Sequence, residues 1–160
     1  MTASRGTTPW VRKSGIRLRE RWTRSCTVPV PRPRRVELPP CSSYKPAIKI
    51  VVVEPAESAV LSGGQPGPHK IEGVGIGYTP PLWEPSLVDE IQVVKTDDAK
   101  EMTRRLAREE ALFAGTSSGA NVLAAIRIGE RLGPNAKVVT LMADSGLKYL
   151  GTDVYRGGRA

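Results

Sequence analysis

The sequence predicts an α/β fold in which a layer of parallel strands is flanked by helices. Three short apolar runs at residues 48–55, 88–94 and 137–143 have the β-branched composition of strands. Two longer segments with helical patterning, residues 97–113 and 118–133, lie between the second and third runs. The first run is rich in β-branched residues and closes with Pro55, which is typical of a strand covered on both faces of a parallel sheet. Alternation of strands with helices indicates an α/β layer architecture.

Local signals support each of the two helices. Thr96 is a candidate N-cap for the first helix, because a threonine hydroxyl can accept a hydrogen bond from the first turn. Asp97 and Asp98 follow it in the first turn, where the helix dipole favours negative charge. The second helix is expected to stop at Gly133 and Pro134, since neither residue continues a helix well.

The chain divides at residue 46 into two parts of different composition. Residues 1–46 hold 11 of the 24 lysines and arginines, two of the 16 acidic residues and half of the 14 prolines. They offer few periodic apolar positions for a core, so we expect this N-terminal third to be irregular or disordered. Residues 47–160 are nearly neutral and carry the predicted strands and helices. We therefore expect an N-terminal arm at 1–46 and a folded domain at 47–160.

The basic arm permits two further interpretations. Clustered arginines gain affinity for phosphates through counterion release, so the arm is also compatible with binding a nucleic acid or an acidic partner. No recognition motif accompanies the charge, which favours a solvated arm over nucleic-acid binding. The first 27 residues, rich in arginine and poor in acids, also resemble an organelle transit peptide in composition.

The cysteines and the hydropathy indicate the cellular environment in which the protein is expected to work. Cys26 and Cys41 stand far from the one histidine, His69, and match neither a metal site nor a disulfide framework. No metal is expected, and a reducing, cytoplasmic location is predicted. No run of about 18 apolar residues occurs, so no membrane-spanning segment is expected.

Three alternating glycines, Gly73, Gly75 and Gly77, form the loop "EGVGIGY". Their spacing differs from the GxGxxG pattern of dinucleotide sites, and no strand leads directly into them. Two interpretations stay open from the residues alone. The glycines either let the backbone approach a ligand closely or form a tight turn that needs positive φ.

The segment "FAGTSSGANV" at residues 113–122 places two hydroxyls at the start of a helix. Free N–H groups there suit a phosphate, but the lysine of a Walker loop is missing. A nucleophilic serine would need a base, and the chain holds only one histidine. Helix capping by Ser117 or Ser118 needs no further partner. The residues alone therefore favour capping.

Three segments together resemble cysteine synthase, also called O-acetylserine sulfhydrylase. They are "VVVEPAESAVLSGGQPGPHKIEGVGIGYTP", "TRRLAREEALFAGTSSGANVLAA" and "DSGLKYL", and the resemblance covers residues 47–160 in family-like order. It places the chain in the pyridoxal-phosphate β-family, which also includes cystathionine β-synthase. It implies the C-terminal portion of a type II pyridoxal-phosphate fold, which is usually a homodimer in the complete family.

The resemblance also implies roles for particular residues. Ser117, the first serine of the pair, corresponds to the residue that hydrogen-bonds the pyridine nitrogen of the cofactor. A neutral hydroxyl makes the ring a weaker electron sink than a carboxylate would, which favours β-elimination and β-replacement on an amino-acid substrate. Gly73, Gly75 and Gly77 correspond to backbone beside the substrate. At the position of Ala143, two residues before Ser145, the family more often has proline.

Family features expected upstream do not match this sequence. The lysine that holds the cofactor and the glycine-rich phosphate loop have no counterpart, and residues 28–43 read "VPVPRPRRVELPPCSS" in place of that loop. No catalytic residue is therefore assigned, and we expect a truncated or frame-shifted chain that is inactive alone. The alternatives are a non-catalytic protein that binds through its basic arm, a cystathionine β-synthase-like fragment, and a fragment that complements or poisons a full-length subunit.

Overall fold

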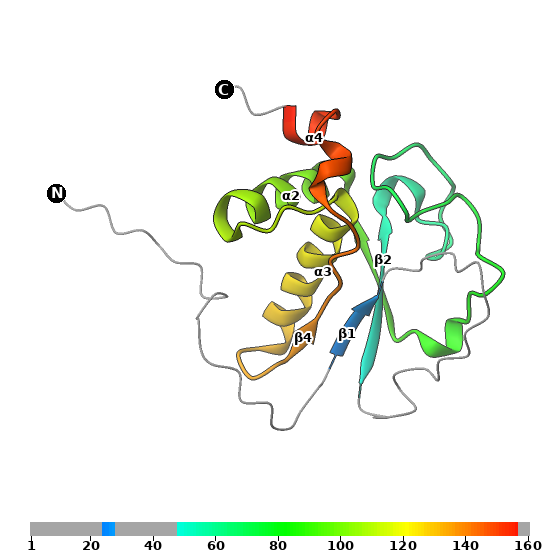
Figure 1. The fold of residues 1–160 in the computed structure, drawn as a ribbon. Helices are drawn as coiled ribbons and strands as arrows, with labels where there is room; N and C mark the ends of the chain where they lie inside the picture. Colours follow the sequence, from blue (N-terminus) through cyan, green and yellow to red (C-terminus); the bar gives the residue numbers. More distant parts are fainter. Residues whose placement is uncertain (1–23, 28–47, 157–160) are drawn as a thin grey trace.

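A four-stranded parallel sheet forms the centre of the protein. The computed structural model describes residues 24–27 and 48–156, with side chains from residue 48 onward. The strand order is β3-β2-β1-β4, and every neighbouring pair is parallel (Figure 1). The strands are β1 (Arg24–Thr27), β2 (Lys49–Pro55), β3 (Glu90–Val94) and β4 (Val138–Val139). The predicted α/β class with a parallel layer is confirmed.

Strand β2 is the most buried element of the sheet. It pairs with β3 from Val51 opposite Glu90 to Pro55 opposite Val94, and with β1 on its other side. Its residues from Val51 to Pro55 are all buried, as the apolar run predicted. The third predicted strand is much shorter than expected, since only Val138 and Val139 pair, and they pair with the four-residue strand β1.

Within residues 1–46, the structure describes only Arg24–Thr27 and places it as β1 between β2 and β4. The remainder of that predicted arm, including Cys41 and the arginine-rich runs, lies outside the described residues. Among the helices of residues 48–156, none is both long enough and apolar enough to cross a membrane.

The two long helices begin one or two residues earlier than expected, and neither is capped by the side chain of its N-cap residue. Helix α2 spans Thr96–Glu110 with Lys95 at its N-cap, and α3 spans Thr116–Leu132 with Gly115 at its N-cap. The predicted capping roles of Thr96, Ser117 and Ser118 are therefore wrong, because all three residues lie inside the first turns. Helix α2 ends before residue 113 because Ala111 adopts the left-handed region, with φ of 56°.

Helices α2 and α3 cross in close contact on one side of the sheet (Figure 1). At Gly119 a Cβ atom would lie 2.1 Å from Thr103 Oγ1 and 2.3 Å from the Ala99 carbonyl oxygen. The buried Thr103 hydroxyl donates to the Ala99 carbonyl at 2.8 Å. The core beneath joins both helices, the sheet and the loop after β2 through Val51, Val53, Ile71, Val74, Val94, Ala99, Ala120, Ala124 and Ile128.

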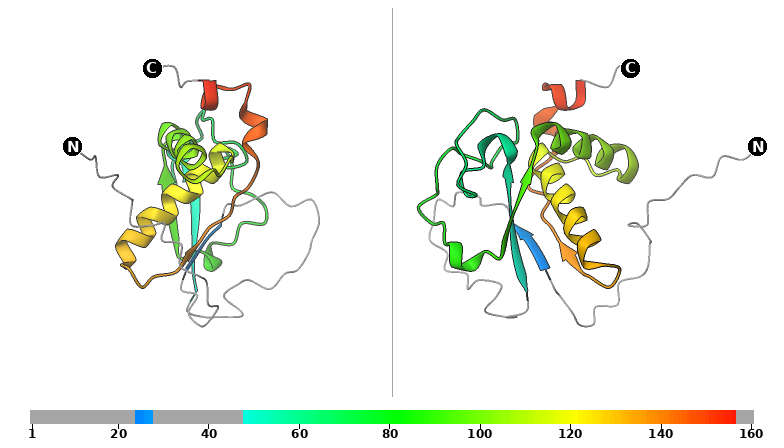
Figure 2. Two further views of the ribbon diagram at one scale, coloured as in Figure 1. Left: turned by 60° about the vertical axis from the view of Figure 1, so that its left-hand side comes forward. Right: turned by 180° about the vertical axis from the view of Figure 1, so that it is seen from behind.

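The C-terminal segment passes the start of α3 and ends against α2 (Figure 2). It contains the 3-10 helix η3 (Gly146–Tyr149) and the short helix α4 (Asp153–Arg156). Two further 3-10 turns, η1 (Ala56–Ser58) and η2 (Pro85–Leu87), lie in the long loop between β2 and β3. Helix α4 is attached to α2 by Lys100, whose Nζ lies 2.8 Å from Asp153 Oδ2, and by Arg104, whose Nε donates to the Val154 carbonyl at 2.7 Å.

Candidate functional site

The candidate site lies at the edge of the sheet where the strands have their carboxyl ends. Helix α3 runs antiparallel to the strands, because Arg131 near its end bonds Glu90 at the start of β3. At the other end of α3, Ser118 bonds Ala143, beyond the end of β4. The start of α3 therefore lies at the same edge as the loop that follows β2. In open α/β sheets this edge is the usual place for a ligand.

Ser117 is nearly buried but has no side-chain partner. The residue is 4% exposed, and its hydroxyl makes no hydrogen bond within the described part of the chain. It lies in the first turn of α3, where backbone N–H groups have no acceptor inside the helix and the dipole is positive. A small hydroxyl in this position can donate one hydrogen bond to an acceptor atom of a ligand.

Ser118 has a different task. It is fully buried, and its Oγ accepts a hydrogen bond from the Ala143 N–H at 3.0 Å. This bond attaches the start of α3 to the segment after β4. The sequence alone did not reveal it, although the presence of alanine at a position where the resemblance implied proline was a signal, since proline has no N–H to donate.

The base that a nucleophilic serine would need is engaged elsewhere. The Nε2 atom of His69 lies 2.8 Å from the Gly75 carbonyl oxygen, and its Nδ1 accepts from the Ile71 N–H at 3.3 Å. Neither ring nitrogen hydrogen-bonds Ser117 or Ser118, which argues against a serine–histidine pair in this geometry.

The glycine loop adopts the conformation that only glycine takes easily. Gly73, Gly75 and Gly77 have φ of 81°, 59° and 82°, in the left-handed region. The interpretation as a turn that needs positive φ is therefore confirmed. Close approach occurs at Gly75, where a Cβ would lie 2.6 Å from Pro55 Cγ and 2.8 Å from His69 Nε2. That close approach is to the protein itself.

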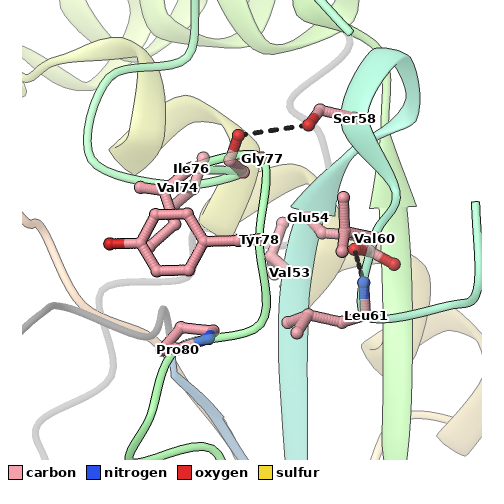
Figure 3. A pocket seen from close by; sticks show the side chains of 11 residues that line it. Val53, Glu54, Ser58, Val60, Leu61, Val74, Ile76, Gly77, Tyr78 and Pro80 are labelled. Carbon is pink, nitrogen blue, oxygen red and sulfur yellow. Dashed lines mark hydrogen bonds between the residues drawn. The ribbon is translucent and has the colours of Figure 1, made fainter. Parts of the chain in front are cut away.

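Two hollows border this loop. Between the loop and the end of β2 lies a cavity of about 20 Å³, large enough only for about one water molecule (Figure 3). The Ser58 hydroxyl, which lines this cavity, donates to the Gly75 carbonyl at 3.1 Å. The other hollow, of about 340 Å³, is lined by residues 67–77 except Pro68 and is large enough for a small molecule.

Glu54, at the end of β2, lines the small cavity and is itself bonded to the turn that follows. Glu54 is 2% exposed, and its carboxylate accepts a hydrogen bond from the Leu61 N–H at 2.9 Å (Figure 3). It also accepts hydrogen bonds from the Ser62 N–H at 3.0 Å and from the Ser62 hydroxyl. Three donors compensate for the burial of the carboxylate. Sequence reasoning treated this residue only as part of an apolar strand, and its polar side chain was the signal that it had a specific partner.

The segment "DSGLKYL" packs against the start of α3. Gly115 donates to the Asp144 carbonyl at 3.2 Å, and a Cβ at Gly115 would lie 2.1 Å from Asp144 Oδ1 and 2.5 Å from Tyr149 Cε2. The Tyr149 hydroxyl donates to Asp144 Oδ2 at 2.9 Å. Burial, together with this hydrogen bond, raises the pKa of Tyr149 well above its usual range. Ser145 caps η3, since its Oγ accepts from the Leu147 N–H at 3.3 Å.

An ion pair connects this segment to the glycine loop. Lys148 Nζ lies 2.9 Å from Asp144 Oδ2 and 3.9 Å from Glu72 Oε2, and Glu72 directly precedes Gly73. The Lys148 and Glu72 side chains are 59% and 60% exposed. The structure thus brings the start of α3 and the glycine loop to one edge of the sheet, as the predicted site requires.

A parallel α/β sheet with a serine pair at a helix start and a glycine loop at its carboxyl edge agrees with the comparisons to known proteins. The family model described as pyridoxal-phosphate dependent enzyme matches residues 40–144. The chain therefore belongs to this family of pyridoxal-phosphate-dependent enzymes. Its fold is part of the type II fold that the sequence predicted. The match begins a few residues before the predicted boundary at 47.

Individual relatives narrow the resemblance. A cysteine synthase of Staphylococcus aureus (strain Mu50 / ATCC 700699) is 47% identical over 110 residues, which are 69% of this chain and 36% of that protein. The solved O-acetyl serine sulfhydrylase isoform 3 of Entamoeba histolytica is 40% identical with a TM-score of 0.69, covering 72% of this chain and 35% of that one. An O-acetylserine-dependent cystathionine beta-synthase from Helicobacter pylori is 37% identical with a TM-score of 0.67, covering 71% and 37%. The chain spans about a third of the length of these relatives.

Proposed function

We propose that this chain supplies the ring-nitrogen side and the substrate loop of a cysteine synthase-type site, for replacing the acyl group of an activated serine with sulfide. The observation that carries the proposal is the unpartnered Ser117 hydroxyl in the first turn of α3. The glycine loop at the same sheet edge supports it. The cofactor, pyridoxal phosphate, supplies an electron sink for breaking the bond to the leaving group.

Ser117 fits the pyridine nitrogen of that cofactor. A pyridine nitrogen without a proton is a hydrogen-bond acceptor, and the Ser117 hydroxyl has a hydrogen to donate. The positive end of the α3 dipole opposes a proton on a nitrogen held there, because that proton would add a second positive charge. The residue therefore favours the neutral ring. Gly73, Gly75 and Gly77 are proposed to border the amino-acid substrate.

We propose that this chain does not catalyse the reaction by itself. Residues 28–43 stand where the resemblance implies the glycine-rich phosphate loop, and they are rich in proline and arginine. The cofactor lysine has no counterpart in the printed sequence. A second polypeptide that carries the lysine and the phosphate loop would complete the site. The complete enzyme of this type is proposed to be a cytoplasmic homodimer. A cystathionine β-synthase-like reaction is the alternative, which the similarity to the Helicobacter pylori enzyme favours.

Fragment complementation tests this proposal. The chain is co-expressed with the first two thirds of the Staphylococcus aureus cysteine synthase, and cysteine formed from O-acetylserine and sulfide is measured. We expect turnover from the pair and none from either piece. In the pair, Ser117→Ala should lower kcat at least tenfold, because the ring nitrogen loses its donor. Ser86→Ala, at an exposed serine bonded to Glu84, is the matched control and should change nothing.

Two results would contradict the proposal. Turnover by the purified chain alone would show that the site is complete without a second polypeptide. A Ser117→Ala variant as active as the Ser86→Ala control would remove Ser117 from the site. A search of the coding DNA in all three frames for a glycine-rich loop before residue 44 tests the frame-shift hypothesis separately.

A further inference from the structure

We infer that His69 is a positioning residue, which fixes the glycine loop by holding the carbonyl oxygen of Gly75, and that it does so as a neutral imidazole with its proton on Nε2. The inference rests on the proposed function only in one respect, the assignment of the loop to the substrate. The structural role of His69 stands on the hydrogen bonds around it.

The neighbours of the ring determine which nitrogen carries the proton. The Ile71 N–H lies 3.3 Å from Nδ1, and a backbone N–H can only donate. Nδ1 must therefore be an acceptor without a proton, and a neutral ring then has its proton on Nε2. Nε2 lies 2.8 Å from the Gly75 carbonyl oxygen, which can only accept. Both contacts require the same tautomer.

Gly75 is the point at which the loop needs to be held. Its φ of 59° is unfavourable for residues other than glycine, and a Cβ there would lie 2.6 Å from the Pro55 ring. The carbonyl of Gly75 receives two hydrogen bonds, one from His69 and one from the Ser58 hydroxyl at 3.1 Å. Both donors precede Gly75 in the chain, Ser58 in the turn after β2 and His69 in the segment just before the loop. Together they define the direction of the peptide plane between Gly75 and Ile76.

The surroundings of His69 contain charges of both signs. Glu57 belongs to η1 and accepts from the Thr96 N–H at 2.9 Å. Burial opposes ionisation of the Glu57 carboxyl, but hydrogen bonds from Thr96 outweigh it and lower its pKa. Glu57 therefore stays ionised near the ring. Besides Glu57, the charged and titratable residues that line a hollow together with His69 are Lys70, Glu72, Tyr149 and Asp153.

Protonation of the ring would break one of its two contacts. A proton on Nδ1 would face the Ile71 N–H, so that two donors would oppose each other. The bond from Nε2 to Gly75 would survive, because both nitrogens of the cation are donors. The contact at Ile71 therefore depends on the neutral tautomer, whereas the contact at Gly75 does not.

The tautomer can be measured directly because His69 is the only histidine of the chain. Two-bond ¹H–¹⁵N spectra of the ¹⁵N-labelled chain at neutral pH should show Nδ1 at the shift of an unprotonated nitrogen and Nε2 at that of a protonated one. The opposite pattern, or averaged shifts for the two nitrogens, would overturn the inference. No variant is needed for this measurement, and no cofactor.

Two substitutions then separate the hydrogen bond from packing. In His69→Gln the side-chain amide can still donate to Gly75, whereas His69→Leu fills the space without a donor. The backbone heteronuclear NOE values at Gly73, Gly75 and Gly77 should stay near wild type in the glutamine variant and fall in the leucine variant. Equal values in both would reduce His69 to a packing residue and refute the positioning role.

The complemented enzyme gives the functional readout. His69→Leu should raise KM for O-acetylserine more than it lowers kcat, and His69→Gln should restore most of the difference. If the loop loosens in the leucine variant while KM is unchanged, the positioning role of His69 stands. That result would refute only the assignment of the loop to the substrate. Failure of complementation itself would contradict the proposed function and leave the tautomer and the loop measurements valid. If the leucine variant does not fold, Ser58→Ala replaces it in the test. This variant removes the second donor to Gly75 and should lower the same NOE values.

Discussion

A methyl group added at Gly119 is expected to destabilise the protein, although alanine is the better helix former. In an unobstructed helix, glycine to alanine would gain about 1 kcal/mol. Here the new Cβ would lie 2.1 Å from Thr103 Oγ1 and 2.3 Å from the Ala99 carbonyl oxygen. The Ala99 oxygen is backbone and cannot rotate away, so α3 must move from α2. Overpacking of this kind costs about 1–3 kcal/mol or more, and we expect a net loss of about 2 kcal/mol.

Two other glycines provide matched controls for this experiment. At Gly151 nothing lies within 4 Å of an added Cβ and φ is not in the left-handed region, so Gly151→Ala should change stability by less than about 0.5 kcal/mol. Gly133 also has open space, but its φ of 82° with ψ of −179° is accessible essentially only to glycine, so Gly133→Ala should cost about 1–3 kcal/mol through backbone strain alone. Urea unfolding followed by circular dichroism measures all three. A Gly119→Ala variant as stable as the wild type would refute the close crossing of α2 and α3.

The remaining predictions concern the C-terminal segment. Hydrogen bonds from Lys100 and Lys70 lower the pKa of Asp153 to about 2, so its carboxylate stabilises the fold above about pH 4 and this stabilisation is lost as the pH falls toward 2. Asp153→Asn should remove that part of the acid dependence, as measured by urea unfolding between pH 2 and 6. Ser118→Ala leaves the Ala143 N–H without its acceptor and should cost about 1–3 kcal/mol, measured by thermal unfolding. Ala143→Pro removes the N–H that donates this bond. The loss of stability in the double variant Ser118→Ala, Ala143→Pro should therefore be smaller than the sum of the losses in the two single variants.

The elements that the sequence predicted correctly are those in which local pattern and tertiary environment agree. Strand β2 is a β-branched run that is buried over most of its length, and its predicted and observed bounds differ by one residue. The strand predicted at residues 137–143 shows the opposite case. Its apolar pattern continues through Leu141 and Met142, but these residues are 54% and 44% exposed and pair with no strand among the described residues. Apolar patterning does not reveal how long the neighbouring strand is.

The details of the site depended on contacts that pattern reasoning does not reach. Hydroxyl residues at a helix start favour capping on average, yet the chain places Gly115 at the N-cap and turns Ser118 toward a segment 25 residues away. The same applies to His69, because its role depends on the loop folding back over six residues to Gly75. The motifs located these residues, and only the three-dimensional contacts distinguished their tasks.

Lys148, which pairs with both Asp144 and Glu72, makes the contact between the start of α3 and the glycine loop sensitive to salt. It joins Asp144 below the start of α3 to Glu72 at the entrance of the glycine loop, and both the lysine and Glu72 are largely exposed. Exposed pairs of this kind contribute about 1 kcal/mol or less and weaken further as salt screens them. The start of α3 and the glycine loop, the proposed cofactor and substrate sides, are thus connected by an interaction that weakens as ionic strength rises. Rising salt should therefore weaken this link while leaving the buried hydrogen bond between Ser118 and Ala143 in place.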